Sequence, residues 1–368
     1  MKFLLFFLLF FQVVSAKYLD NHSCKECHEK IYEEFESSVH AKSFFTDELH
    51  RQIANKSNKN KYDCAQCHMP MADNLKDIIS GKAKVDKANK THTDAVSCYF
   101  CHTIAYVKKA HRFNINTKAR QADNYKPTLY GRLSNPEDSD KHSSIKNPIY
   151  GKMACLGCHS HKLNENNVTI FKAMDKSQDS LECIKCHMPE VEGGVEKLDK
   201  KARGHHASHK FLGIRDKDFR KKGVDIDISF KDKELLVKLT NKMAHPLIIQ
   251  PARAKYLELK VKRGAKVIWS NYKKSPKEDT KGYFAYFFKK DGKKIILPSS
   301  ATSSRANNIG TKEVKVLKYS IDKLKKGDLV ELNFWVRLAK EDCTKEVDLK
   351  DKSFLEPMLI KSISKKVD

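Results

Sequence analysis

The sequence predicts an α+β protein in two parts, with a mostly helical and irregular N-terminal part followed by a C-terminal antiparallel β-sandwich. Two observations lead to this prediction. Residues 17–220 contain five copies of one five-residue pattern of cysteine and histidine, and they show few regular apolar periods. After residue 220 apolar and polar residues alternate, which is typical of half-buried strands.

Residues 1–16 have the features of an export signal. The stretch MKFLLFFLLFFQVVSA contains a lysine and an apolar run, and it ends in Val14, Ser15 and Ala16, which form a small-residue cleavage site. The run is shorter than the roughly 20 residues of a membrane-spanning helix, although an uncleaved anchor is the alternative. We therefore expect a periplasmic protein with a cleaved signal peptide and Lys17 as its first mature residue.

The repeated pattern Cys-x-x-Cys-His is the strongest feature of the chain, because ten of the eleven cysteines lie in it. In an exported chain, paired cysteines could form disulfides, but a disulfide framework does not need a histidine after every second cysteine. The five copies place cysteines at Cys24 and Cys27, Cys64 and Cys67, Cys98 and Cys101, Cys155 and Cys158, and Cys183 and Cys186, and histidines at His28, His68, His102, His159 and His187.

Covalent haem c requires this set of side chains. Two thiols add to the vinyl groups of the porphyrin, and the imidazole of the next residue ligates the iron. A zinc ribbon would leave the five histidines unexplained, and dithiols of the thioredoxin type normally occur singly on a βαβ scaffold. The pattern therefore predicts five covalent haems c, bound by the ten cysteines, with the five motif histidines as proximal iron ligands.

The composition agrees with this interpretation. The formal net charge is +25, and nucleic acid is the usual partner of so basic a chain. An exported chain would not meet nucleic acid, however, and the lysines are spread along the whole length. Haem propionates would offset part of the charge, and the rest would make a basic surface for acidic redox proteins or a membrane surface, with a solvated lysine-rich surface as the alternative.

In residues 17–220, haem is expected to replace an ordinary core. Helical turns are still expected, as in the stretch KIYEEFESSVHAKSFF, where Ile31, Phe35, Val39 and Phe44 recur at roughly helical spacing. Such a helix would place His40 on a defined face.

Residues 221–368 form the predicted β-sandwich domain. Val224, Ile226, Ile228 and Phe230 alternate with polar residues, and further strand-like runs include KVIWSNY, YFAYFFKK, KKIILP, EVKVLKYS and LVELNFWVRL. The dipeptide at 291–292, Asp-Gly, indicates a hairpin turn between two of these runs. Cys343 is expected to be an incidental thiol, with intermolecular pairing as the alternative.

These stretches resemble the exported multihaem c-type cytochromes related to the tetrahaem cytochrome c-554 group. The similar segments are SVHA, VSCYFCHTI, YGRLSNPEDSDKHSSIKNPIYGKMACLGCH, ECIKCHMP and NKMAHPLIIQPAR. In the last segment, the stretch AHPLIIQ departs from the Gly-His and Pro-Thr-Gly that the family usually has at this place. The resemblance implies electron transfer through stacked haems, although some relatives are enzymes that use one open iron.

Each iron could take a second ligand on the face opposite the motif histidine, or remain open there. Eleven other histidines are available as such distal ligands. The resemblance implies this distal role for His40 and His142, and similarly for His209. His92 and His111 flank the third motif and are either further distal candidates or surface residues. His205 and His206 are competitors of His209 for its role. His22, His50, His161 and His245 are expected to be structural or surface residues.

Two functions from different classes remain. A respiratory electron carrier would pass electrons between a membrane quinol-oxidising partner and a terminal reductase, and it would have no catalytic residues. A multihaem oxidoreductase would act on a small nitrogen or sulfur compound at a haem with an open iron. All five motifs have the ordinary proximal histidine, and spare histidines are numerous enough to cap every iron, so the sequence favours the carrier over the enzyme.

Overall fold

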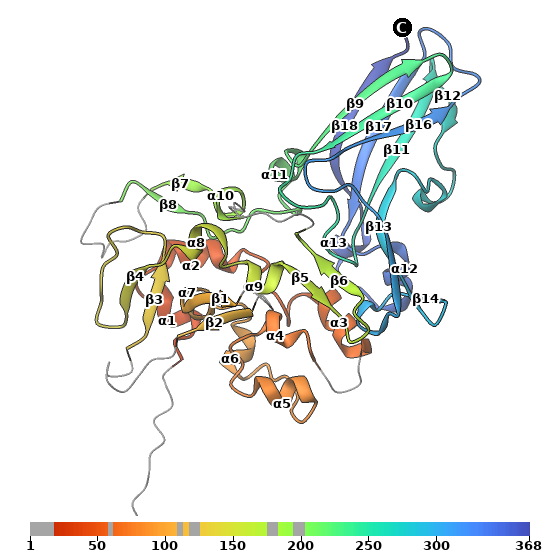
Figure 1. Ribbon diagram of the computed structural model, residues 1–368. Helices are drawn as coiled ribbons and strands as arrows, with labels where there is room; N and C mark the ends of the chain where they lie inside the picture. The colour runs from red at the N-terminus through yellow and green to blue at the C-terminus, as the bar shows by residue number, and fades with distance from the viewer. Residues whose placement is uncertain (1–17, 58–61, 109–112, 118–125, 175–182, 194–202) are drawn as a thin grey trace, which may run out of the picture.

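The computed structural model of the chain describes residues 18–57, 62–108, 113–117, 126–174, 183–193 and 203–368. Short helices and two-stranded ribbons make up the N-terminal part, and a large antiparallel β domain follows it (Figure 1). The α+β fold class is therefore confirmed. Residues 1–16, the expected export signal, lie outside the described residues. Among the described residues, no helix has the length and apolar character needed to cross a membrane.

The helices of the N-terminal part are short, and the five motifs fall on or beside five of them. The helices are α1 Asn21–Lys25, α2 Glu29–Glu36, α3 Glu48–Ser57, α4 Ala65–His68, α5 Leu75–Ser80, α6 Lys90–Thr93, α7 Cys98–His102, α8 Ile149–Lys152, α9 Leu156–His159, α10 Cys183–His187 and α11 Lys217–Lys221. Most are shorter than three turns, a length at which a helix depends on packing for its stability.

Two-stranded ribbons connect the motif helices. They are β1 Ile104–Lys108 with β2 Phe113–Asn116, β3 Thr128–Gly131 with β4 Ser143–Lys146, β5 His161–Leu163 with β6 Thr169–Lys172, and β7 Glu190–Glu192 with β8 His205–Ala207. The β3 and β4 pair is parallel and the others are antiparallel. Buried apolar side chains form small separate clusters here, one around Phe44 and Met69 and one around Phe100 and Tyr150.

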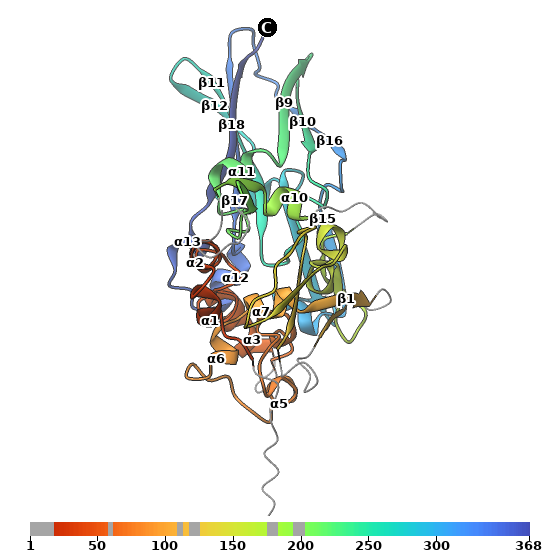
Figure 2. The same cartoon turned by 90° about the vertical axis from the view of Figure 1, so that its left-hand side faces the viewer.

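The β domain consists of two antiparallel sheets that share one core. A three-stranded sheet has the order β16-β10-β9, and a larger sheet has the order β14-β13-β11-β17-β18, with β12 on β11 and β15 on β13. Figure 2 shows the two sheets as separate layers. Their strands are β9 Val224–Lys231, β10 Glu234–Asn241, β11 Ala254–Arg263, β12 Lys266–Ser270, β13 Tyr283–Lys290, β14 Lys293–Ile295, β15 Ser303–Asn307, β16 Val314–Ser320, β17 Leu329–Arg337 and β18 Met358–Lys366.

The core between the sheets follows the alternation read from the sequence. Leu235, Val237 and Leu239 of β10 are fully buried, and they belong to the same cluster as Leu257 and Phe334 of the larger sheet. At the predicted turn, residues 291 and 292 connect β13 to β14, and both have positive φ, 49° and 79°. Such angles are what a tight hairpin turn requires.

Helix α3 belongs to the N-terminal part in sequence but packs against the β domain. Leu49 is 4% exposed and lies in one cluster with Ile296, Leu338 and Cys343, which places the eleventh cysteine in an apolar interior. The same cluster contains residues from the helices α12 Glu341–Glu346 and α13 Lys352–Leu355. The Glu48 carboxylate accepts hydrogen bonds from two backbone N–H groups in the segment just before α13, both at 2.9 Å. The β domain therefore fixes the position of α3.

Candidate haem-binding sites

Each motif is folded into a helical turn that presents its three functional side chains together. The N–H of His28 donates to the carbonyl of Cys24 at 2.9 Å, and the equivalent bonds in the second and fourth motifs are 3.0 Å and 2.9 Å. Residues three and four apart lie on the same face of a helical turn. Both thiols and the imidazole of a motif therefore face the same side, as covalent attachment and ligation of one haem require.

The five motifs are packed against one another through their thiols. The thiols of Cys24 and Cys98 lie close enough to interact electrostatically, which places the first motif against the third. Equivalent contacts place the second motif against the fourth and the fourth against the fifth, between Cys67 and Cys158 and between Cys155 and Cys183. The potential haem attachment points therefore form two groups, the first motif with the third, and the fourth motif with the second and the fifth.

Every motif histidine lies against a second histidine from elsewhere in the chain. We number these pairs as sites 1 to 5 in the order of the motifs. The ring centroids are 6.4 Å apart for His28 and His142 at site 1, 4.5 Å for His68 and His50 at site 2, 6.2 Å for His102 and His209 at site 3, 6.0 Å for His159 and His40 at site 4, and 6.4 Å for His187 and His245 at site 5.

Three of these separations fit an iron held between two imidazoles, and the separation at site 4, 6.0 Å, is about 0.2 Å shorter. A metal to histidine nitrogen bond of roughly 2.0–2.1 Å on each side, with about 1.1 Å from nitrogen to ring centroid, gives about 6.2–6.4 Å. The rings are near parallel at sites 1, 3 and 5, with interplanar angles of 28°, 24° and 20°. At site 2 the rings are tilted by 41° and closer together, so this pair must open by roughly 2 Å to accept an iron.

Hydrogen bonds to the second ring nitrogen orient most of these imidazoles. Nδ1–H of His68 donates to the Ser43 carbonyl at 2.7 Å, and Nδ1–H of His102 donates to the Tyr130 carbonyl at 2.8 Å. The second histidines of two pairs are held in the same way. Nδ1–H of His209 donates to the Ala207 carbonyl at 2.8 Å, and Nδ1–H of His245 donates to the Pro246 carbonyl at 2.9 Å. A proton held on Nδ1 leaves the lone pair of Nε2 free, which is the tautomer that binds a metal.

Burial keeps several of these rings neutral. It lowers the pKa of His40 to about 3 and the pKa values of His68, His159 and His209 to about 4. A neutral imidazole is the ligating form. Protons therefore do not compete for these nitrogens near neutral pH.

Three of the expected distal candidates lie beside motif histidines, namely His40, His142 and His209. Of the two competitors, His206 contacts the Gly193 carbonyl at 2.8 Å and the Glu34 carboxylate at 3.2 Å, and its neighbour His205 is exposed. His111 lies outside the described residues.

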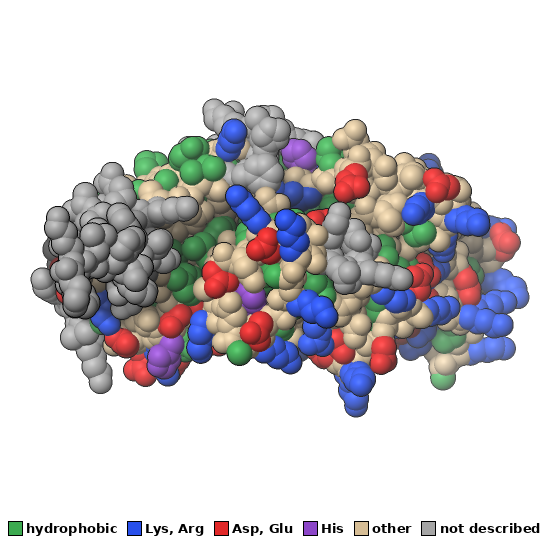
Figure 3. Space-filling view, turned by 90° about the horizontal axis from the view of Figure 1, so that it is seen from below, with side chains coloured by type: hydrophobic (Ala, Val, Ile, Leu, Met, Phe, Trp, Pro, Cys, Tyr) green, Lys and Arg blue, Asp and Glu red, His purple; other side chains and the backbone are tan. Residues whose placement is uncertain are grey.

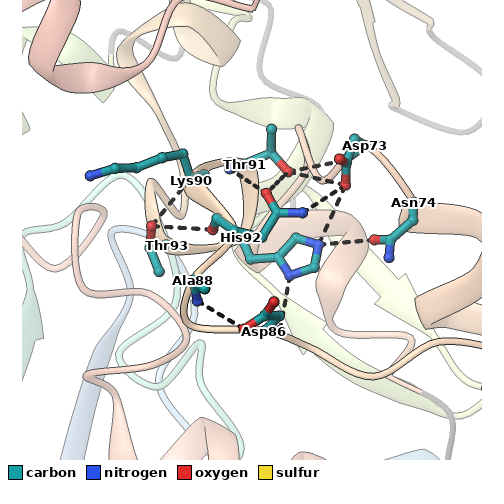
Figure 4. A network of polar contacts seen from close by, with 9 residues as sticks. Asp73, Asn74, Asp86, Ala88, Lys90, Thr91, His92 and Thr93 are labelled. Carbon is teal, nitrogen blue, oxygen red and sulfur yellow. Dashed lines mark hydrogen bonds and ion pairs between the residues drawn. The ribbon is translucent and has the colours of Figure 1, made fainter.

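His92 does not lie beside a motif histidine, and its expected role as a distal candidate is corrected by its contacts. The ring is 1% exposed, and Nδ1 accepts the backbone N–H of Asp86 at 3.0 Å (Figure 4). Nε2 then carries the proton and donates to Asn74 Oδ1 at 2.9 Å. Both nitrogens are occupied, so His92 is a structural residue that joins two loops.

Two partners of motif histidines, His50 and His245, differ from the prediction that they are structural or surface residues. His50 lies on α3, where Asp47 Oδ2 contacts its Nδ1 at 2.7 Å. The helical spacing of Leu49 and Ile53, which pack on the β domain, could have indicated that this helix presents a defined face inward.

His245 comes from the β domain itself, on the loop between β10 and β11. Asn241, at the end of β10, is fully buried and donates from Nδ2 to the His245 carbonyl at 2.9 Å and to the Gly310 carbonyl at 2.8 Å. This side chain fixes the loop. The β domain therefore contributes directly to site 5 and, through α3, supports site 2.

Comparisons with known proteins also indicate a resemblance to multihaem c-type cytochromes. The model of the family described as cytochrome c554 and c-prime matches residues 23–103, which include the first three motifs. The structure is similar to the crystal structure of a penta-heme cytochrome c552 from Thermochromatium tepidum, with a TM-score of 0.73, 22% sequence identity, and coverage of 96% of this chain and 100% of that one. No curated protein matches the sequence. The chain resembles the multihaem c-type cytochromes of this family, and covalent haem c is the cofactor that the resemblance supports.

Proposed function

We propose that this chain is a periplasmic pentahaem c-type cytochrome, exported by its leader, that transfers electrons between respiratory redox partners. The observation that carries the proposal is the pairing of all five motif histidines with a second histidine. When bound, haem c would supply an iron centre that gains and loses one electron. The two cysteines of each motif would hold it covalently.

The paired histidines favour a carrier over an enzyme. With two histidines at each site, each haem would be held by two protein ligands, and a substrate would have to displace one of them before it could bind. The same ligands in both oxidation states keep the change in geometry on electron transfer small. An enzyme of the same family would instead need one site without a second histidine.

One four-residue segment connects three of the five sites. His209 belongs to site 3, and the ring of Phe211 lies 4.3 Å from that of His40 at site 4. The carbonyl of Leu212 accepts the Nδ1–H of His187 at site 5, at 2.5 Å. Together with the contacts between motif thiols, this segment holds the sites in fixed relative positions, as passage of electrons through the chain requires.

The basic surface supports an acidic redox partner. Lys and Arg side chains are spread over the face seen in Figure 3 and gather towards its β-domain end. On the hairpin of β13 and β14, Lys289, Lys290, Lys293 and Lys294 are all exposed. Surface lysines of this kind steer association with negatively charged proteins. Membrane quinol-oxidising complexes and terminal reductases are the partners that we propose, with the anionic membrane surface as a further contact.

The experiment uses protein matured in a host that attaches haem c. Intact-mass measurement should show the chain from Lys17 with five haems, and the reduced protein should exchange electrons with acidic acceptor proteins at a rate that falls with added salt. Turnover of nitrite, hydroxylamine or sulfur oxyanions with an artificial donor should be negligible. Fewer than five haems, or turnover at about 1 per second or faster, would contradict the proposal.

A further inference from the structure

The ring of His40 is held differently from the other distal histidines. Nδ1 of His50, His142, His209 and His245 each has a hydrogen-bond partner. Nδ1 of His40 is buried and has no hydrogen-bond partner among the residues that the structure describes. This nitrogen is therefore the exception within an otherwise consistent set.

Packing takes the place of the missing hydrogen bond. The Phe211 ring contacts the His40 ring at a centroid distance of 4.3 Å and an angle of 72°. Phe211 itself has φ of 50°, a left-handed conformation that is unusual and strained for a bulky side chain. A strained neighbour thus supplies the main contact that orients His40.

The missing bond weakens His40 as a ligand. When Nε2 binds a metal, Nδ1 carries a proton, and a buried N–H without an acceptor is destabilising. Hydrogen bonds to the outer nitrogen of a ligating histidine raise its basicity, and their loss typically weakens metal binding about 10–100-fold. The angle of 89° between the rings of His40 and His159 also separates site 4 from the near-parallel sites 1, 3 and 5.

We infer that site 4 is a binding site for small neutral ligands such as carbon monoxide, which enter by displacing His40, whereas the other four sites keep both histidines. His40 would give up its place as a ligand through Nε2, the incoming ligand would supply the replacing lone pair, and no electron would be transferred. The inference rests on the ligand pairs of the proposed function. Site 4 also lies next to sites 2, 3 and 5. A ligand bound at site 4 would therefore interrupt electron transfer among these sites.

The test is a titration of the fully reduced holoprotein with carbon monoxide, followed by absorption difference spectra and stopped flow. The wild type should bind one carbon monoxide per chain, at a rate that levels off as the concentration rises because departure of His40 is limiting. His40→Ala should still bind one, at least about 10-fold faster and in proportion to the concentration. His209→Ala, the matched control, should bind two, since site 3 is opened in addition to site 4.

A second pair of variants tests the role of packing without removing a ligand. Phe211→Ala should raise the limiting rate about 10-fold, within the range expected for loss of outer support, with the stoichiometry unchanged at one. Phe171 contacts the proximal ring of the same site, His159, at 5.9 Å, and Phe171→Ala should leave the limiting rate within about 2-fold of wild type.

The inference is overturned if the wild type binds no carbon monoxide, if His40→Ala and His209→Ala bind the same number, or if Phe171→Ala accelerates binding as much as Phe211→Ala. The oxidised wild type separates this failure from failure of the proposed function. If the oxidised protein shows five low-spin irons and the reduced protein binds no carbon monoxide, the inference fails and the proposed function stands. A high-spin iron in the untreated protein would contradict both the inference and the proposed function.

Discussion

His245→Ala tests the most unexpected part of the ligand set, a distal histidine supplied by the β domain. The ring of His245 faces that of His187 at 6.4 Å with an interplanar angle of 20°, and the loop that carries it is fixed by Asn241. Removal of the ring takes one ligand from one of the five paired sites. We therefore expect one low-spin signal of the oxidised protein to become high-spin, while the signals of the other four sites persist.

His92→Ala is the matched control, because His92 is also buried but both its nitrogens are used within the protein. Its loss leaves the N–H of Asp86 and the Oδ1 of Asn74 without partners, at a cost of about 1–3 kcal/mol for each group that stays buried. The free energy of unfolding should therefore fall while the spin state stays unchanged. Electron paramagnetic resonance and thermal unfolding of both variants measure the two effects.

The result that would refute the reasoning is an exchange of these two outcomes. If His245→Ala kept five low-spin signals, the β domain would not supply a ligand and its contact with the N-terminal part would be structural only. If His92→Ala produced a high-spin signal, the hydrogen bonds that assign it a structural role would be misleading.

Two further predictions concern the support of site 2 and the interior of the β domain. Leu49→Ala should weaken the packing of α3 on the β domain by about 2–5 kcal/mol, because a buried leucine side chain is lost, and part of the site 2 signal should become high-spin. The control Leu163→Ala, at a position that is 48% exposed, should change neither quantity. An equal effect of both variants would refute the role of α3. Burial lowers the pKa of Lys255 from 10.5 to about 7, while its Nζ donates to the Leu247 carbonyl at 2.8 Å. Between these two pKa values the unfolded chain binds a proton that the folded chain does not, so the free energy of unfolding should rise from pH 7 to pH 10. Lys255→Met should flatten this rise in thermal unfolding midpoints, and an equal slope in both proteins would show that Lys255 is not its source.

The sequence was sufficient where the chemistry is local. A Cys-x-x-Cys-His turn brings its own thiols and imidazole together, so the positions of the attachment residues and of His28, His68, His102, His159 and His187 follow from spacing alone. The β-strands followed from alternation because one face of each sheet is buried. The resemblance supplied three distal candidates, His40, His142 and His209, and the structure brings each of them to a motif histidine.

The other distal partners depend on tertiary structure that no local pattern encodes. His50 reaches His68 because α3 is fixed by the β domain, and His245 reaches His187 across the boundary between the two parts. The change of pattern near residue 220 separates a haem region from a β domain, and it indicates neither contact. His92 shows the opposite difficulty, since a buried histidine close to a motif resembles a ligand until its hydrogen-bond partners are known.

The central claim is that each of five haems lies between two histidines of this chain. Magnetic circular dichroism in the near infrared, applied to the oxidised wild-type holoprotein, tests it most directly, because the energy of the charge-transfer band identifies the axial ligand pair. We predict bands of bis-histidine irons alone, with an intensity that corresponds to five haems per chain. A high-spin band, or a band of histidine with methionine, at the intensity of one or more haems would contradict the claim.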